Sequence, residues 1–339
     1  MPLAVFVPME YLSSYGLLGQ MAREIGDALG RAGAEINPDR GCAPGEPRVY
    51  LFFNFPADMA VFETWTQPDI PGGVVLHIFV DHPFALEPRV LDALVRNPSY
   101  RLLLPSLDDL HLIPLRWPGI RAATLPHAVG PHALLLAKPD VEKREFDVVL
   151  AGSISSNSAI TAARSRIPAA IRTHADAAAE MLVARPTMPF TAAFDACSPS
   201  GLTSSDHWTL LRDVWAYVTA RVNRARRTAV ATSMQGLRTL VLGSREWEPL
   251  CRGSVVYGDH VSYAELPGHL QRANVCAAWN PTQFVLTHSE RVLLGMAAGC
   301  ATITDDRPGL RRALGGLSLI HISEPTRLRR ISYAVFCLK

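Results

Sequence analysis

Short apolar runs alternate along the chain with longer segments in which apolar residues recur at helical spacing. The first run covers residues 3–8, and in residues 15–32 the side chains of Leu18, Met21 and Ile25 then fall three or four positions apart. Further continuous runs, bounded by Pro or Gly, lie at 48–55, 74–80 and 100–104. Strands that are buried on both faces have this uninterrupted apolar character, so the pattern predicts a parallel, doubly wound sheet.

The same alternation begins again after a charged, proline-containing stretch at 131–146, which has the composition of a linker. A strand is expected at 147–154, and residues 155–234 have a largely helical pattern that is interrupted where Ser and Gly cluster at 197–208. Four more strands are predicted at 238–244, 254–259, 274–281 and 300–306, with helices at 263–273 and 288–299.

The fold class that follows is α/β, with two Rossmann-like domains that face each other across a cleft, where ligands of such folds usually bind. The predicted organisation is a first domain at 1–130, a linker at 131–146, a second domain at 147–316, and a tail at 317–339.

Composition narrows the class of protein further. A chain of 339 residues with 48% hydrophobic and 19% charged residues can bury a large core. No apolar run approaches the roughly 18 residues that cross a bilayer, and the first residues lack a signal-peptide pattern, so we expect a soluble, cytoplasmic protein without a transmembrane segment. Six widely separated cysteines indicate neither a zinc site nor a disulfide framework, and a net charge of +2 argues against a nucleic-acid surface.

The last residues, LSLIHISEPTRLRRISYAVFCLK at 317–339, can be tested by translating them back into codons. LSLIHISEPTR and ISYAVFCL then resemble a transposase-type sequencing adapter and the flow-cell sequence that follows it, separated by room for an index. The alternative is a genuine edge strand with a cationic turn. We expect this tail to be non-native and the native chain to be truncated near Gly316, inside the second domain; without the tail the net charge becomes slightly negative.

Residues 256–310 contain a series of short motifs: Tyr-Gly at the end of a strand, Asn-Pro at the end of the next, then HSERV, GMAAGC and TDD. This stretch resembles the carboxy-terminal domain of group 1 glycosyltransferases of the GT-B fold, particularly the branch that includes CgeB-like spore proteins. The segments LAGS at 150–153, VLGSREW at 241–247, VDHPF at 80–84 and LPHA at 125–128 extend the resemblance over most of residues 75–310.

The resemblance implies a glycosyltransferase that moves a sugar from a nucleotide-diphosphate-sugar donor to an unknown hydroxyl acceptor, with retention of configuration. The first domain would then face the acceptor. No D-x-D motif is present, so metal-independent transfer without a further cofactor is expected. Two alternatives remain open: a catalytically silent coat or scaffold protein, and a nucleotide-sugar epimerase. A nicotinamide dehydrogenase is least favoured, because no G-x-G-x-x-G follows the strands at 3 or 147.

The chemistry of HSERV can be argued from its residues. A helix that opens at His288 or Ser289 offers free N–H groups and a positive dipole end to a diphosphate, with Arg291 in its first turn. Ser289 is equally suited to be an ordinary N-cap. By resemblance Glu290 would bind ribose or sugar hydroxyls, although an acidic residue in a first turn also compensates the dipole. Many relatives have a second Glu where this chain has Leu294, which weakens the match to standard donor recognition.

Other predicted donor-binding residues follow strands. Gly152 and Ser153 would let the backbone approach a phosphate, and Asn280 lies at a strand's carboxyl end, where an Asn-Pro turn is the alternative. By resemblance Tyr257 and Gly258 fit a loop near the nucleobase.

Three residues are candidates for catalysis. Asp81 and His82 follow the strand at 74–80, and a histidine beside an acid could take a proton from the acceptor. A strand-end cap is the alternative for this pair. His127 is the third candidate, at the domain junction, where a structural role is the alternative. Trp247 is interpreted as a core residue, Gly295 and Gly299 as packing positions, and no metal ligands are predicted.

Overall fold

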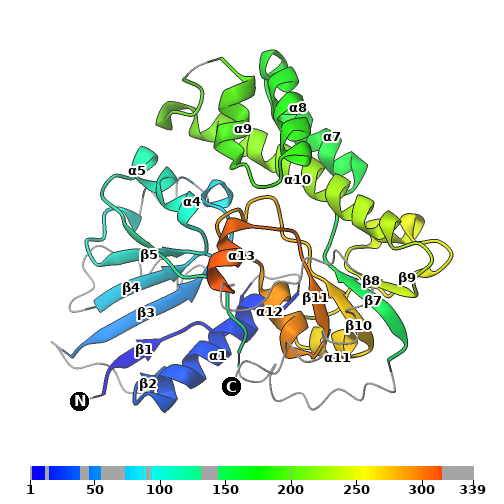
Figure 1. Ribbon diagram of the computed structural model, residues 1–339. Coiled ribbons are helices and arrows are strands. Elements are labelled where there is room, and N and C mark those ends of the chain that lie inside the picture. The colour runs from blue at the N-terminus through cyan, green and yellow to red at the C-terminus, as the bar shows by residue number, and fades with distance from the viewer. Residues whose placement is uncertain are drawn as a thin grey trace. The chain divides into compact units, whose positions relative to one another are not determined.

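The computed structural model of the protein describes residues 2–11, 15–38, 46–54, 73–86, 88, 92, 94–130, 144–199 and 201–314 (Figure 1). The predicted tail at 317–339 and most of the predicted linker lie outside these residues. Residue contacts divide the chain into two compact units. One comprises Met1–Pro126 with Ser262–Ala264, and the other comprises His127–Val261 and the residues from Glu265 onward.

The first unit is built on a six-stranded sheet in which every pair of strands is parallel. Its strand order is β2-β1-β3-β4-β5-β6. The strands are β1 (Ala4–Phe6), β2 (Glu35–Ile36), β3 (Arg48–Phe53), β4 (Gly73–Ile78), β5 (Tyr100–Leu104) and β6 (Arg121–Thr124). The predicted apolar runs therefore are strands, while β2 and β6 have no apolar run of their own and were not predicted.

The helices of the first unit include α1 (Leu17–Arg31), the 3₁₀ turn η1 (Pro83–Ala85), α4 (Leu107–Leu110) and α5 (Leu112–Arg116). The helix α1 buries Leu18, Ala22 and Gly26, which are spaced four residues apart and so lie on one face. Leu18 and Ala22 pack with Val5, Leu51 and other strand residues to form a core. The helical spacing seen in the sequence is thus the buried face of α1.

The second unit has a five-stranded parallel sheet in the order β11-β10-β7-β8-β9. The strands are β7 (Phe146–Ala151), β8 (Thr239–Leu242), β9 (Val255–Tyr257), β10 (Ala273–Ala277) and β11 (Ala301–Ile303). The chain starts at β7 in the middle, extends to one side through β8 and β9, and then crosses to β10 and β11 on the other side. Together the two parallel sheets with flanking helices confirm an α/β fold with two Rossmann-like units.

A helical insertion separates β7 from β8, as the pattern of 155–234 predicts. It consists of α7 (Asn157–Arg166), α8 (Ala169–Ala184), α9 (Phe190–Cys197), η3 (Ser205–His207) and the long α10 (Trp208–Ser233), coloured green to yellow in Figure 1. Asp176 ties α8 to its neighbours, since it accepts from Arg164 of α7 and from Tyr217 and Arg221 of α10. The insertion is therefore a packed element of the second unit.

The remaining elements of this unit are η4 (Arg245–Leu250), α11 (Leu266–Gln271), α12 (Glu290–Ala297) and α13 (Pro308–Ala313). Trp247 of η4 is fully buried with Val148, Leu150 and Val241, which confirms its interpretation as a core residue. A Cβ on Gly295 would lie 2.8 Å from Cys276 Sγ, so this glycine lets α12 pack closely on β10. Within the part of the chain that the structure describes, no helix has the length and apolar character needed to span a membrane.

Candidate functional site

The sheet of the second unit reverses its strand order between β7 and β10, and ligands of open α/β sheets bind at the carboxyl ends of the strands at such a reversal. Gly152 and Ser153 follow β7 at this position, and Asn280 follows β10. The topology therefore brings these three predicted residues to one edge of one sheet. The backbone and side chains around this edge define the candidate site.

The segment 151–155, directly after β7, is held by side chains that come from elsewhere in the sequence. Three arginines donate to alternate carbonyl oxygens: Arg291 Nη1 to Ala151 (3.1 Å), Arg227 Nη1 to Ser153, and Arg224 Nη1 to Ser155 (2.7 Å). All three guanidinium groups therefore lie within hydrogen-bonding distance of one five-residue segment. The turn after β7 thus gathers three guanidinium groups, one of which, that of Arg291, also lies 3.7 Å from the Glu290 carboxylate.

The intervening carbonyls of the same segment accept from the loop that follows β8. Trp247 Nε1 donates to the carbonyl of Gly152 over 2.7 Å, and Ser244 Oγ donates to that of Ile154 over 2.8 Å. The backbone N–H of Ser244 in turn donates to Ser153 Oγ over 3.0 Å. The turn after β7 is consequently fixed from both sides before any ligand binds.

Gly152 is required at this turn for two physical reasons. Its φ of 148° is a conformation that residues with a side chain rarely adopt. A Cβ atom at this position would lie 2.5 Å from Arg291 Nη1 and 3.3 Å from Arg227 Cζ. The glycine therefore leaves the space into which both guanidinium groups extend.

The helix α12 begins at the same edge of the sheet, with Ser289 as its N-cap residue. Asn280 Oδ1 accepts from the N–H of Ser289 over 2.8 Å, which holds the start of the helix against the end of β10. The Ser289 hydroxyl is fully buried but makes no capping bond, and it has no hydrogen-bond partner. The alternative that Ser289 serves only as an N-cap therefore lacks the capping hydrogen bond.

Buried polar atoms without a hydrogen-bond partner gather in the loop that leads from β10 into α12 and in the first turn of that helix. They are Trp279 Nε1, Gln283 Oε1, Thr287 Oγ1, Ser289 Oγ and Arg291 Nε. Buried polar groups normally have partners, because an unsatisfied donor or acceptor costs about 1–3 kcal/mol. A ligand bound at this edge of the sheet would meet hydrogen-bonding groups that the protein itself does not satisfy.

Glu290 is the first residue of α12 and contacts two charged or polar side chains. Its Oε2 lies 3.2 Å from His127 Nδ1, and its Oε1 lies 3.7 Å from Arg291 Nε. Burial raises the pKa of the Glu290 carboxyl, but the His127 hydrogen bond and the Arg291 charge outweigh it and lower the pKa to about 2. Glu290 is thus ionised at neutral pH, and His127 carries its hydrogen on Nδ1.

His127 and His288 lie close to this carboxylate. The His127 ring packs edge-on against Phe284, with ring centres 5.0 Å apart. His288 is buried, and its Nδ1 lies 3.2 Å from the Ser289 carbonyl oxygen. Burial is the main reason that the pKa of His288 is lowered, so this ring is neutral at pH 7.

Tyr257 and Gly258 lie further along the sheet, at the end of β9. The Tyr257 hydroxyl donates to Asp259 Oδ1 over 3.1 Å, and burial together with this carboxylate raises the Tyr257 pKa to about 12. A Cβ on Gly258 would lie 2.5 Å from Leu240 Cδ1, so Gly258 is needed for packing on β8.

Asp81 and His82 belong to the first unit. Asp81 accepts from Asn54 Nδ2 over 3.0 Å. His82 Nδ1 accepts from the N–H of Phe84, which places the ring hydrogen on Nε2, 3.4 Å from Asp109 Oδ1. The ring is 5% exposed, and burial lowers its pKa to about 3. The His82 side chain thus caps the 3₁₀ turn η1.

Sequence reasoning missed Arg224, Arg227 and Asp305 as members of the site. The two arginines occur within a long helical pattern, where basic residues usually mark a solvated face, and no spacing connects them to Gly152. Asp305 had a weak signal, because it follows a predicted strand as part of the TDD motif.

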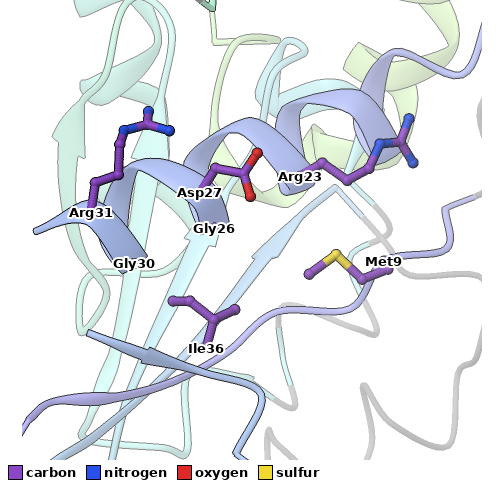
Figure 2. A pocket seen from close by; sticks show the side chains of 7 residues that line it. All are labelled: Met9, Arg23, Gly26, Asp27, Gly30, Arg31 and Ile36. Atoms are coloured by element: carbon purple, nitrogen blue, oxygen red, sulfur yellow. The ribbon is translucent and has the colours of Figure 1, made fainter. Parts of the chain in front are cut away.

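A separate groove of about 340 Å³ lies in the first unit along α1 (Figure 2). Its lining residues are Met9, Arg23, Gly26, Asp27, Gly30, Arg31 and Ile36. The charged side chains alternate in sign at four-residue spacing along the helix, which is common on solvated helix faces. None of the predicted site residues lines this groove.

Within the described residues, no three His, Cys, Asp or Glu side chains are grouped so that they could hold a metal ion. The chain matches no protein-family model and no curated protein.

Proposed function

We propose that this protein is a glycosyltransferase that moves a sugar from a nucleotide-diphosphate-sugar donor to a hydroxyl acceptor, independently of a metal and with retention of configuration. The observation that carries the proposal is the row of Arg224, Arg227 and Arg291 along the turn after β7, at the point where the sheet reverses its strand order. A ligand at this position meets three guanidinium groups and the amino end of α12.

This arrangement suits the chemistry of a leaving nucleoside diphosphate. Negative charge accumulates on the diphosphate as the bond to the sugar breaks, and fixed positive groups that meet this charge lower the barrier. Arginine is well adapted to this role, because its planar group can donate two parallel hydrogen bonds to phosphate oxygens. The turn is held by Trp247 and Ser244, so little reorganisation is needed when the ligand binds.

The ionised Glu290 supplies the acceptor atoms that an anion site would otherwise lack. Its carboxylate can accept hydrogen bonds from ribose or sugar hydroxyls. His127 and Arg291 orient it, and the His127 ring is itself held by Phe284. Positive groups for the diphosphate and one acceptor for hydroxyls are the combination that a nucleotide-sugar requires.

The test is calorimetric binding of uridine and guanosine diphosphate sugars, followed by a search for sugar release and transfer across a panel of acceptors. We expect binding that weakens as salt concentration rises, because the contacts are ionic. Absence of binding for every donor, under conditions in which the protein is folded by circular dichroism, would overturn the proposal.

A second candidate is a protein that binds the nucleotide without transferring sugar. The observation that favours it is Leu294, which stands where many glycosyltransferases of the resembling group have a second glutamate and which is fully buried in the core. Nucleotide binding without sugar release for any donor would support this candidate. Turnover of a donor without any acceptor, with an epimerised sugar as product, would instead favour an epimerase.

A further inference from the structure

We infer that Asp305 is a positioning residue for the anion site, and that it holds the start of α12 in place through the side chain of Asn280. The inference rests on the proposed function, because it concerns how the same site is kept in shape. It also gives the helical insertion a role in ligand binding, since Arg226 of α10 is one of the groups that hold Asp305.

Asp305 follows β11 and is almost completely buried. Its Oδ1 accepts from both the backbone N–H and the side-chain Nδ2 of Asn280, over 3.0 and 2.9 Å. Its Oδ2 accepts from Arg226 Nη2 over 2.9 Å and from Arg307 Nε over 2.5 Å. One carboxylate therefore joins the ends of β10 and β11 to α10.

The contact with Asp305 decides which way the Asn280 amide points. Because Nδ2 donates to Asp305 Oδ1 and to Thr304 Oγ1, the amide oxygen is directed to the other side, where it accepts from the N–H of Ser289. A reversed amide would set an N–H group against the N–H of Ser289. The orientation of the Asn280 amide thus holds the start of α12, the helix that carries Glu290 and Arg291, in position.

Burial raises the pKa of Asp305, but the charges of Arg307 and Arg226 and the hydrogen bond from Asn280 outweigh it, and the pKa is lowered. The carboxylate is therefore ionised at neutral pH. A buried ion cluster stabilises little in itself, yet loss of its single carboxylate leaves buried guanidinium groups without that partner. Arg226 Nη1 is already buried without a hydrogen-bond partner, which makes the cluster sensitive to loss of the carboxylate.

One face of α10 contacts three of the loops that surround the site. Asn223, Arg226 and Arg227 are three and four residues apart and so lie on the same side of the helix. Asn223 Oδ1 accepts from the N–H and the hydroxyl of Thr282, Arg226 donates to Asp305, and Arg227 donates to Ser153. The insertion thereby links the loops after β7, β10 and β11.

The experiment compares Asp305→Asn with Asp306→Asn. The two carboxylates are neighbours, but Asp306 is exposed and pairs with Arg311, so the control makes the same chemical change outside the network. Binding of inorganic pyrophosphate and uridine diphosphate is measured by calorimetry, and the folded fraction by circular dichroism. We expect the Kd of both probes to be at least tenfold higher in Asp305→Asn and to change less than twofold in Asp306→Asn.

Two further measurements separate positioning from general loss of structure. In Asp305→Asn, amide hydrogen exchange should accelerate in peptides that cover Ser289 and Glu290 but not in peptides that cover β7. Combined with Asn280→Ala, Asp305→Asn should cause little additional loss of affinity, because both changes break the same connection. Asn280→Ala alone provides the test of the same connection if Asp305→Asn does not fold.

The outcomes distinguish this inference from the function on which it rests. If the wild-type protein binds neither probe, the proposed function fails. If the wild-type protein binds and Asp305→Asn binds equally well, or if the losses from Asp305→Asn and Asn280→Ala simply add, the positioning role is wrong while the proposed function stands.

Discussion

His127 Nδ1 lies 3.2 Å from Glu290 Oε2, although the two residues are 163 positions apart in the chain. The contact joins the histidine of the LPHA segment to the first residue of α12. It keeps the Glu290 carboxylate ionised and in a defined orientation at the edge of the sheet. The first prediction concerns this carboxylate.

Glu290→Gln should weaken binding of a nucleotide-sugar by about 10- to 100-fold, since a hydrogen bond to a charged acceptor contributes about 1.5–3 kcal/mol. Because the pKa of Glu290 is about 2, the difference between variant and wild type should persist at pH 5. Calorimetry at pH 5 and pH 7 measures it. Glu248→Gln is the control, as Glu248 is exposed and pairs with Arg245. Equal affinities of Glu290→Gln and wild type would contradict the role of Glu290.

Two serines at helix starts should respond in opposite ways to replacement by alanine. Ser156 caps α7, because its Oγ accepts from the N–H of Ala159 over 3.0 Å, so Ser156→Ala should lower the free energy of unfolding by about 1 kcal/mol and leave binding unchanged. The Ser289 hydroxyl makes no cap, so Ser289→Ala should leave stability nearly unchanged and weaken pyrophosphate binding. Urea unfolding and calorimetry measure the two effects. A loss of stability without a loss of affinity in Ser289→Ala would show that Ser289 acts only as an ordinary N-cap.

Gly152→Ala and Gly236→Ala separate the cost of an unusual φ from the cost of crowding. Both glycines have a positive φ, but a Cβ on Gly236 would meet no atom within 4 Å, whereas one on Gly152 would meet Arg291. Gly236→Ala should destabilise by about 1–2 kcal/mol and keep binding intact. Gly152→Ala should add about 1–3 kcal/mol for overpacking and displace the guanidinium groups, so that pyrophosphate binding is lost. Similar effects of the two changes in unfolding and binding measurements would refute this account of the turn.

His77 should make the first unit less stable in acid. This ring is buried on β4 beside Phe52 and lies 2.7 Å from the Tyr100 hydroxyl, and burial lowers its pKa from 6.5 to about 3. Between these values the unfolded chain binds a proton that the native ring does not. The free energy of unfolding therefore falls with decreasing pH, by about 1.4 kcal/mol per pH unit from this group.

The double variant His77→Phe, Tyr100→Phe removes both hydrogen-bonding partners together and keeps two aromatic rings in the core. Its free energy of unfolding should depend less steeply on pH between 6 and 4 than that of the wild type. Urea unfolding at several pH values measures the slope. An unchanged slope would show that His77 does not titrate as its burial indicates.

The alternation of apolar runs with helical spacing predicted nearly every strand, because a strand buried on both faces must be apolar throughout. It missed β2, which is two residues long and half-buried, and β6, whose sequence RAAT has alternating exposed and half-buried residues, so neither has an apolar run. The Asn280, Ser289 and Arg291 positions were accessible to sequence reasoning, because each follows a strand or opens a helix. Arg224 and Arg227 were not, because their partners are backbone carbonyls some 70 residues away in the chain.

The sequence by itself determined the α/β class, two successive series of strands and helices, and the strand ends at which polar residues gather. These features depend on local periodicity, which burial imposes on every strand and helix separately. The tertiary structure alone decided that α10 brings Arg224 and Arg227 to the turn after β7 and Arg226 to Asp305, and that Asp305 orients Asn280. Such contacts depend on the crossing of elements that are distant in the chain, and hydrophobic spacing contains no information about which polar side chains meet there.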